Sequence, residues 1–378
     1  MADETPDELA HEVGDEEEPG AGKPDPDRLK QFLRRAGADV AAGFNCAITV
    51  LGDRLDLYQA LDEQGPSTSA ELARATDLHE RWVREWLQHQ ACAGQIEFDA
   101  ASARFRLSPE ARAVLVDADH PAFLMGAYDA ALSVYPAVEH LQEAFRTGLG
   151  MSYDDHGPSC ACAIERMGAF TKNHRLVPDL IPQVGDMDAR LRTGAQVADV
   201  GCGGALSTIA MAQRYPASTF VGYDVSEHAL TRARANLAES RLANVTLLNP
   251  LHTPLPDAPT YDFVTTFDVV HDTPYPAALI AQIHAALKTD GVWLCEDIRG
   301  FETFAENLEK HPLAAMLYGF SVMVCMNAGM AEPDGAGLGT LGFTEETARR
   351  MTQAAGFTAF TRLDIDNPMN SYYVLTKA

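Results

Sequence analysis

The chain has 378 residues, of which 46% are hydrophobic and 22% charged, an ordinary composition for a folded protein that predicts two or three domains at about 150 residues each. Its 29 Lys and Arg against 54 Asp and Glu give a net charge of −25, so most of the surface repels a nucleic acid backbone or an anionic membrane. No long apolar run and no secretory signal pattern is present, so we expect no membrane span and a cytoplasmic location.

The cysteines predict reduced thiols rather than a disulfide framework. There are seven, an odd number without framework spacing. Cys160 and Cys162 lie close in sequence to His156 and His174, which would allow a metal site, but no second cysteine pair accompanies them. We therefore expect no bound metal.

Residues 1–27 are predicted to form a disordered acidic tail. They are rich in Asp and Glu and contain one Lys and hardly any large apolar residue, so they lack the hydrophobic surface that a fold buries. A docking arm is the alternative interpretation of this segment.

Residues 28–118 show the pattern of a winged helix-turn-helix domain. A capping box at Thr68–Glu71 predicts the start of one helix, and Asp77–Glu80 predicts the start of a second. Residues 96–107 alternate apolar and polar side chains across a short turn, which predicts a two-stranded wing. Residues 108–110, Ser-Pro-Glu, predict a further helix start.

Such a domain serves either DNA binding or dimerisation. On the predicted recognition helix, residues 82–89, the nearby Arg81 and Arg84 are offset by neighbouring glutamates, and no basic stripe flanks the helix. The segment 44–61 is apolar on more than one face and suits a subunit interface. We therefore expect a homodimer and no nucleic acid partner.

The remainder of the chain divides into a connector and an α/β domain. Residues 119–192 are predicted to be mostly helical, with a loop around Tyr153. In residues 193–378, short apolar strands alternate with amphipathic helices, which is typical of a doubly wound α/β fold. An insertion at 300–342 follows the fifth predicted strand of this domain.

A ligand site is predicted where the first strand of the α/β domain turns into a helix. The run Asp199–Gly204, with the letters DVGCGG, joins an apolar strand to a helix predicted over 206–214. Gly201 and Gly203 allow tight backbone geometry and close approach of a ligand, and the helix N-terminus offers free N–H groups. In open α/β sheets this strand end borders the crevice at the topological switch point.

The acids around this bend indicate the class of ligand. Asp224 ends the next predicted strand, about two dozen residues after the first glycine, where a carboxylate accepts both hydroxyls of a ribose. A nicotinamide dinucleotide would want a glycine in place of Leu206 and an apolar residue in place of Asp199. Asp199 would repel a pyrophosphate, but it can order the loop and hold the α-amino group of a nucleoside that carries an amino acid.

These motifs resemble those of the class I S-adenosylmethionine-dependent methyltransferases. The run Asp199–Gly204 is similar to the first motif of that family, Asp224 takes its ribose-binding position, and residues 249–256 resemble its adenine-side loop. The resemblance covers residues 193–378. It implies a Rossmann-like domain with a seven-stranded sheet, S-adenosyl-L-methionine as cofactor, and Asn249 among the residues that bind it.

A narrower resemblance concerns the reaction. The run Phe267–Asp272, FDVVHD, is similar to the segment of small-molecule O-methyltransferases of the caffeate and acetylserotonin type in which a His-Asp pair supplies the general base. Those enzymes also have an N-terminal winged-helix dimerisation domain. The resemblance implies methyl transfer to a small metabolite of the kind found in secondary metabolism, with oxygen as the expected acceptor atom and nitrogen, sulfur or carbon as alternatives.

This resemblance also assigns residues to roles. His271 and Asp272 are the expected catalytic residues, since an imidazole titrates near neutrality and Asp272 or another carboxylate can orient it. A structural histidine that caps the strand is the alternative. Asp268 joins the expected cofactor-binding residues. Glu296 and Asp297, at the end of the fifth strand, are expected at the rim of the crevice or in structural ion pairs.

The loop at Tyr153 resembles a family segment that closes over the cofactor, where an aromatic face would attract a sulfonium. Two departures from the family pattern are Ala205, where a third glycine is common, and Asn249, near a position that often carries an acid. The methionines of the insertion are interpreted as core or as the wall of an apolar acceptor pocket.

Two other functions stay open. A methyltransferase-like protein can cleave or cyclise S-adenosylmethionine through another carbon and release methylthioadenosine. A winged-helix protein can also be a ligand-sensing regulator that binds DNA through Arg81 and Arg84.

Overall fold

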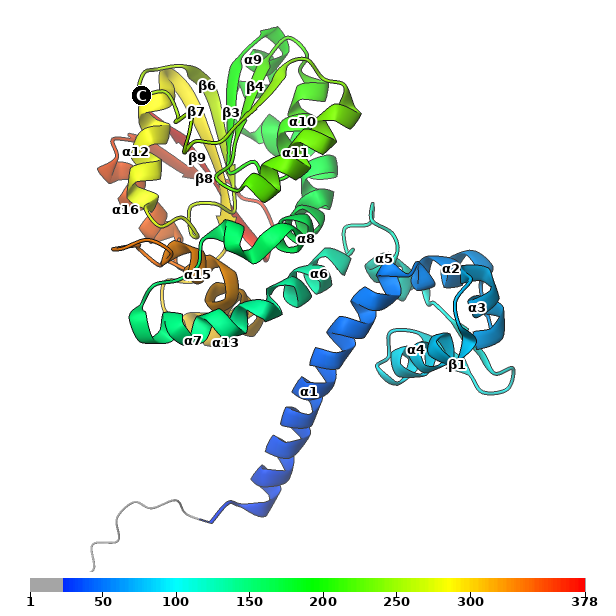
Figure 1. Cartoon of the computed structure of the whole chain (residues 1–378). Coiled ribbons are helices and arrows are strands. Elements are labelled where there is room, and N and C mark those ends of the chain that lie inside the picture. The colour runs from blue at the N-terminus through cyan, green and yellow to red at the C-terminus, as the bar shows by residue number, and fades with distance from the viewer. Residues whose placement is uncertain (1–22, 378) are drawn as a thin grey trace, which may run out of the picture. The chain divides into compact units, whose positions relative to one another are not determined.

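The structure is a computed structural model that describes residues 23–377 (Figure 1). Most of the acidic tail predicted at 1–27 therefore lies outside the described residues. The chain divides into two compact units, Met1–Asn45 and Cys46–Ala378. Helix α1 (Pro26–Arg54) contributes the described part of the first unit and continues into the second.

The winged helix-turn-helix pattern forms a small helical domain with a two-stranded wing. Its elements are α2 (Leu57–Gln64), α3 (Ser69–Thr76), α4 (Glu80–Cys92), β1 (Glu97–Asp99), β2 (Arg104–Arg106) and α5 (Pro109–Leu115). The strands pair antiparallel with Phe98 opposite Phe105. The capping box is present, because Thr68 accepts from the Glu71 N–H while the Glu71 carboxylate accepts from the Thr68 N–H.

One predicted helix start in this domain is wrong. Asp77 does not cap α4 but ends α3, in the left-handed conformation with φ 53°. The cap of α4 is His79, whose ring accepts from the Arg81 N–H. The Glu80 carboxylate accepts instead from the Ser69 hydroxyl at 2.5 Å, which ties the two helices together.

The connector is a succession of helices with one irregular segment. It contains α6 (Met125–Val134), η1 (Tyr135–Ala137), α7 (Val138–Thr147), η2 (Tyr153–His156), α8 (Gly157–Phe170), η3 (Thr171–Leu180), η4 (Ile181–Gln183) and α9 (Met187–Thr193). Helix α8 runs directly into η3, where the hydrogen bonds follow the wider π pattern and Pro178 lies within the segment. Segments of π-helix are frequent at functional sites.

A seven-stranded sheet forms the centre of the α/β domain (Figure 1). Its strands are β3 (Gln196–Val200), β4 (Thr219–Tyr223), β5 (Val245–Leu248), β6 (Tyr261–Phe267), β7 (Leu287–Ile298), β8 (Ala359–Arg362) and β9 (Asn370–Thr376). They lie in the order β5-β4-β3-β6-β7-β9-β8. The first five are parallel, and β9 is antiparallel to both β7 and β8. The order reverses at β3, so its carboxyl end is the switch point where such sheets bind ligands.

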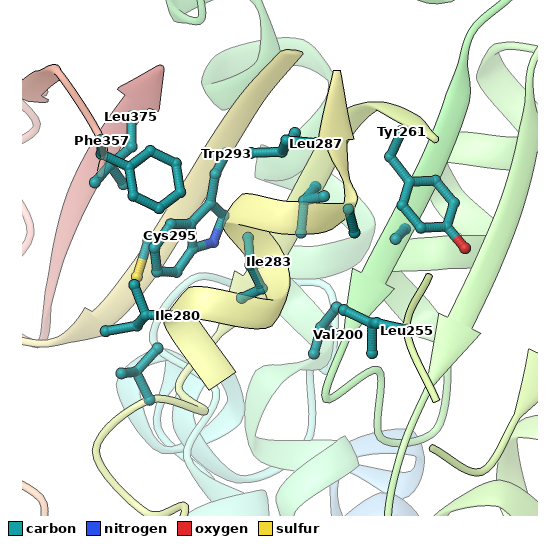
Figure 2. Close-up of a cluster of buried hydrophobic side chains, with 14 of the residues drawn as sticks. Val200, Leu255, Tyr261, Ile280, Ile283, Leu287, Trp293, Cys295, Phe357 and Leu375 are labelled. Carbon is teal, nitrogen blue, oxygen red and sulfur yellow. The ribbon is translucent and has the colours of Figure 1, made fainter. Parts of the chain in front are cut away.

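Two hydrophobic layers cover the sheet. On one face, α12 (Pro276–Ala286) and α16 (Glu345–Ala354) pack on side chains that include Trp293 and Phe357, as the close-up in Figure 2 shows for α12. The Trp293 indole N–H is satisfied by the Thr266 hydroxyl at 3.0 Å, so this large side chain is fully buried without a polar penalty. On the other face lie η3, α9 and α10 (Leu206–Arg214), with α11 (Glu227–Ser240) beside α10.

The predicted insertion at 300–342 is helical. It contains α13 (Phe304–Lys310), α14 (Ala314–Phe320), a second π segment η5 (Ser321–Cys325) and α15 (Met326–Gly329). In the part of the chain that the structure describes, no helix has both the length and the hydrophobicity needed to cross a bilayer.

Candidate active site

The glycine bend after β3 has the geometry that its sequence predicts. Gly201 and Gly203 have φ of 73° and 55°, values that residues with a side chain rarely adopt. A Cβ on Gly201 would collide with Val269, whereas nothing lies within 4 Å of the Cβ position of Gly203. The bend is therefore closed on the β6 side and open at Gly203. Ala205, at the position of the missing third glycine, caps α10 in the same left-handed region at φ 61°.

Asp199 stabilises this bend through hydrogen bonds to the neighbouring elements. Its carboxylate is buried and accepts from the hydroxyls of Ser207 and Thr208, both at 2.6 Å, and of Thr265 at 2.8 Å. The three donors come from α10 and β6, so the acid ties the strand that carries it to both neighbouring elements. This arrangement satisfies a buried charge with hydrogen bonds instead of a cation.

Asp224 reaches across to the bend from the end of β4. Its Oδ2 accepts from the Gly203 N–H at 2.8 Å, and its Oδ1 accepts from the Ser226 N–H at 2.8 Å. Burial raises the pKa of Asp224 to about 6, although both N–H groups favour the charged form. The carboxylate thus sits beside the open glycine, with lone pairs left for further donors.

Asn249, in the loop after β5, is hydrogen-bonded to the loop after β4. Its amide donates to the Val225 carbonyl at 3.2 Å and to Glu227 at 2.8 Å, and its oxygen accepts from the Leu251 N–H at 2.9 Å. This residue is buried, and its side chain supports the segment that follows Asp224.

The predicted covering loop is fastened to the same region. Asp154 accepts from the Ser226 hydroxyl at 2.5 Å and from the His228 N–H at 3.2 Å, so a carboxylate from the connector caps the N-terminus of α11. Burial raises the pKa of the neighbouring Tyr153 well above its ordinary value, and the charges of Asp272 and Asp224 raise it further.

A second fastening joins α8 to the bend. Glu165 accepts from Asn236 at 2.9 Å and from Arg232 at 3.0 Å, and Asn236 also donates to the Gly204 carbonyl at 2.9 Å. A side chain on Gly204 would collide with the Glu165 carboxylate. A side chain at Gly204 would therefore displace the Glu165 carboxylate that joins α8 to the bend.

His271 lies beyond the end of β6, and its partner is Asp297. The distance from His271 Nδ1 to Asp297 Oδ1 is 2.6 Å, and both side chains are buried. Burial on its own lowers the pKa of His271, but the Asp297 carboxylate and Cys325 together outweigh it, and the resulting pKa is well above the ordinary value. Asp297 also accepts from the N–H groups of Val270 and Ile298.

Asp272 or another carboxylate was expected to orient the ring, and the carboxylate that meets Nδ1 is Asp297. β6 and β7 are neighbouring parallel strands, so Asp297 at the end of β7 meets His271, while Asp272 is the next residue along the chain. Burial raises the pKa of Asp272 to about 7, with Asp224 and Asp297 adding to the effect. The His271 charge acts in the opposite direction and lowers this pKa.

The connector and the insertion meet over these strand ends. Cys325, the last residue of η5, is close enough to His271 to raise its pKa, and it packs with Tyr153 in one apolar cluster. The Asn327 side chain accepts from the Met151 N–H at 2.9 Å, and Gly150 allows the two backbones to approach. The side chains near His271 therefore come from three separate parts of the chain.

Asp268 makes its hydrogen bond to the C-terminal strand β9. It follows β6 with φ 60° and accepts from the Asn370 amide at 2.7 Å. Burial and the nearby Glu296 carboxylate raise its pKa. Strand alternation puts Glu296 and Asp297 on opposite faces of β7, so Glu296 lies with Asp268 while Asp297 lies with His271.

The proposed metal alternative finds no support in the geometry. Among residues 23–377 no three His, Cys, Asp or Glu side chains are arranged to hold a metal ion. The His174 ring pairs with Asp119 at 3.0 Å instead. Two surface cavities, of about 330 and 480 Å³, lie at the Arg54–Arg166 region and along α7, away from the strand ends.

Two sequence families match the chain. Residues 198–293 match the family described as a methyltransferase domain, and residues 44–117 match the Rv2258c-like winged HTH domain. The chain carries a methyltransferase domain. The matched part of the methyltransferase domain runs from β3 into β7 and includes the glycine bend, Asp224 and His271. No curated protein matches the chain in sequence.

Solved structures resemble nearly the whole chain. A proposed O-methyltransferase from Nostoc punctiforme PCC 73102 has 19% identity and a TM-score of 0.67, with 94% of this chain and 99% of that one covered. An O-methyltransferase family protein from Burkholderia thailandensis has 15% identity and a TM-score of 0.66, with coverage of 93% and 98%. Human N-acetylserotonin methyltransferase, solved in complex with SAM, has 15% identity and a TM-score of 0.64, with coverage of 95% and 99%.

At these identities the likeness concerns the fold. The predicted class, a Rossmann-like α/β methyltransferase domain with a seven-stranded sheet behind a winged-helix domain, is confirmed. The resemblance to class I methyltransferases is confirmed with it.

Proposed function

We propose that the protein transfers a methyl group from S-adenosyl-L-methionine to a hydroxyl group of a small-molecule metabolite. The observation that carries this proposal is the placement of the open glycine bend with Asp224 two strands from the His271–Asp297 pair, at one edge of the sheet. A nucleoside site and a base for an acceptor are thereby brought within reach of one small ligand.

The residues present fit this cofactor. The open main chain at Gly203 and the unfilled lone pairs of Asp224 suit a ribose. In the proposal, Gly201 and Asn249 shape the site, Asp199 orders it, Asp268 lies at its far side and Tyr153 covers it. When bound, S-adenosylmethionine supplies an electrophilic methyl group on a sulfonium.

The protein's own task is then to move a proton. The raised pKa of His271 means that the ring is neutral, and able to act as a base, only at pH values above that pKa. In that form it accepts the proton of the acceptor hydroxyl at Nε2, because Asp297 accepts from Nδ1. Asp297 then stabilises the imidazolium that forms. Asp272, the residue after His271, helps to align the acceptor in this proposal.

The assay uses purified protein, S-adenosylmethionine and a panel of hydroxylated metabolites or a metabolite extract. We expect release of S-adenosylhomocysteine and a product heavier by one CH₂, both detected by mass spectrometry. His271→Gln should lose at least about 100-fold in rate but keep its cofactor affinity, and His284→Gln, on α12 beside Phe357, is the matched control. Methylthioadenosine as the only nucleoside product would replace this function with cleavage or cyclisation.

A homodimer is part of the proposal. Val40 and Phe44 are 62% and 66% exposed and share one face of α1 by their spacing. Sedimentation should give a dimer mass for the parent, and Val40→Glu with Phe44→Glu should give a monomer. We also propose a cytoplasmic location, in keeping with seven free cysteines.

The alternative function, a regulator that binds DNA through Arg81 and Arg84, is not favoured by the contacts of these two residues. Arg81 pairs with Glu85, and Arg84 pairs with Glu80, all on α4. Phosphate contacts would therefore compete with ion pairs already made.

A further inference from the structure

A second charged cluster lies at the ends of β6 and β7, on the face opposite His271. Lys172, from the first turn of η3, places its ammonium 3.3 Å from Glu296 Oε1 and 3.7 Å from the ring centre of Phe267. The side chains of Lys172 and Glu296 are only 14% and 3% exposed. These residues are far apart in sequence, so the contact exists only in the folded chain.

The cluster is incomplete as an ion pair. Glu296 Oε2 is buried and has no hydrogen-bond partner in the described structure. Asp268 lies near enough for the Lys172 charge to lower its pKa, and its Oδ1 accepts from Asn370. One lysine thus faces two acidic side chains, and the buried carboxylate oxygen of Glu296 without a donor is costly. A cationic ligand group with several N–H donors would satisfy that oxygen.

The cluster borders the glycine bend. β6 pairs with β3 as far as Thr266 opposite Val200, so Phe267 and Asp268 lie beside Gly201. The next residue, Val269, packs against Gly201 directly. From Asp224 at the end of β4 to Asp268 beyond β6 is two strand spacings, or about 10 Å. A nucleoside whose ribose binds Asp224 would reach this cluster with the chain on its 5′ side.

The groups match the two charges of an α-amino acid. A zwitterion presents an ammonium and a carboxylate a few bonds apart, and the cluster presents an unpartnered carboxylate oxygen next to an ammonium. Charge-assisted hydrogen bonds of this kind are the strong ones. The wider turn of η3 brings Lys172 over Phe267, in line with the use of π segments at binding sites.

Resting on the proposed function, we propose that Lys172 and Glu296, with Asp268, form the subsite for the amino-acid end of the cofactor. Lys172 binds its α-carboxylate. Glu296 Oε2 and Asp268 bind its α-ammonium. Asp199, whose oxygens are filled by three hydroxyls, then orders the bend without holding the amino group.

Calorimetry with three ligands tests this assignment on the full-length protein. The ligands are S-adenosylhomocysteine, its analogue without the α-carboxylate, and methylthioadenosine, which lacks the whole amino-acid end. Lys172→Met and Glu296→Gln should each weaken S-adenosylhomocysteine binding by roughly 10- to 100-fold, as for a lost hydrogen bond between charged groups. Both should bind methylthioadenosine like the parent. With the decarboxylated analogue, only Glu296→Gln should lose affinity.

The matched control is Lys288→Met, which removes a lysine paired with Asp262 at 2.8 Å at the opposite end of the sheet. It should leave all three affinities unchanged. Equal losses for S-adenosylhomocysteine and methylthioadenosine, or no loss for either, would overturn the subsite. If the parent itself binds neither nucleoside, the proposed function fails. If the parent binds S-adenosylhomocysteine and the variants bind it equally well, only the subsite fails.

Discussion

Replacing Asp297 by Asn removes one charge from beside His271 and changes little else in size. The two groups are 2.6 Å apart and buried, and the carboxylate is the largest influence that raises the pKa of His271 against the effect of burial, followed by Cys325. At an effective dielectric constant of about 20, unit charges centred about 4 Å apart attract by about 4 kcal/mol. We therefore expect the pKa of His271 to fall in Asp297→Asn and, because burial remains and lowers it, to lie below its ordinary value.

The dependence of stability on pH should change with it. A histidine whose folded pKa is raised stabilises the parent fully below about pH 6.5, and this contribution is lost as pH rises through the folded pKa. In the variant the folded pKa is lowered, so the slope reverses and stability is lost as pH falls below about 6.5. The Val270 and Ile298 N–H groups both donate to Asp297, so the amide also leaves one donor unmatched and lowers stability by about 1 to 3 kcal/mol at all pH values.

The measurement is an NMR titration of protein labelled with ¹⁵N in histidine. The His271 ring signals are assigned by their loss in His271→Gln, and urea unfolding at several pH values gives the stability slope. A pKa for His271 that is the same in parent and Asp297→Asn would refute the electrostatic reasoning. It would also remove Asp297 as the group that positions the base.

Three further outcomes test the nucleoside side of the site. Asp224→Ala should weaken S-adenosylhomocysteine binding by roughly 100-fold or more in calorimetry, since two hydrogen bonds to a charged acceptor are lost. Because the pKa of Asp224 is about 6, the affinity of the parent protein should also fall as the pH is lowered below about 6. An affinity that does not change with pH would contradict a role for Asp224 in ribose binding. Gly201→Ala should lower the free energy of unfolding by about 2 to 4 kcal/mol through its φ of 73° and the collision with Val269. Adding Val269→Ala should restore the part of the unfolding free energy that is lost through the collision. If nothing is restored, the whole loss comes from the unfavourable backbone conformation. Asp154→Ala should cost about 1 kcal/mol and speed hydrogen exchange in the first turn of α11, whereas unchanged exchange there would mean that its cap contributes nothing.

Signals from neighbouring residues in the sequence were sufficient to predict several helices and strands and the glycine bend. The helix predicted at 206–214 is α10, and the capping box at Thr68 forms, because each depends on residues a few positions apart. The glycines predict a bend because their conformations are intrinsic to residues without a Cβ. Asp77 shows the limit of such signals, since an aspartate suits a left-handed helix end as well as a cap, and the neighbouring His79 took the cap.

Contacts between distant segments could not be predicted in this way. The choice of Asp297 over Asp272 follows from the adjacency of β6 and β7, which is a property of strand order. Lys172 carried no motif, and only the packing of η3 beside the sheet places it near Glu296. The hydroxyls that occupy Asp199 come from α10 and β6, so its partners were hidden until the layers were assembled.

Two consecutive acids on β7 point to opposite faces of the strand, Glu296 toward Lys172 and Asp297 toward His271. Inserting or deleting one residue in this strand would exchange the two faces, so that the imidazole would lose its carboxylate partner. Continuous pairing with β9 from Val292 to Ile298 fixes the frame. The length of β7 is thus under tighter constraint than the identity of most residues along it, and an evolving or engineered variant can change its side chains far more freely than its spacing.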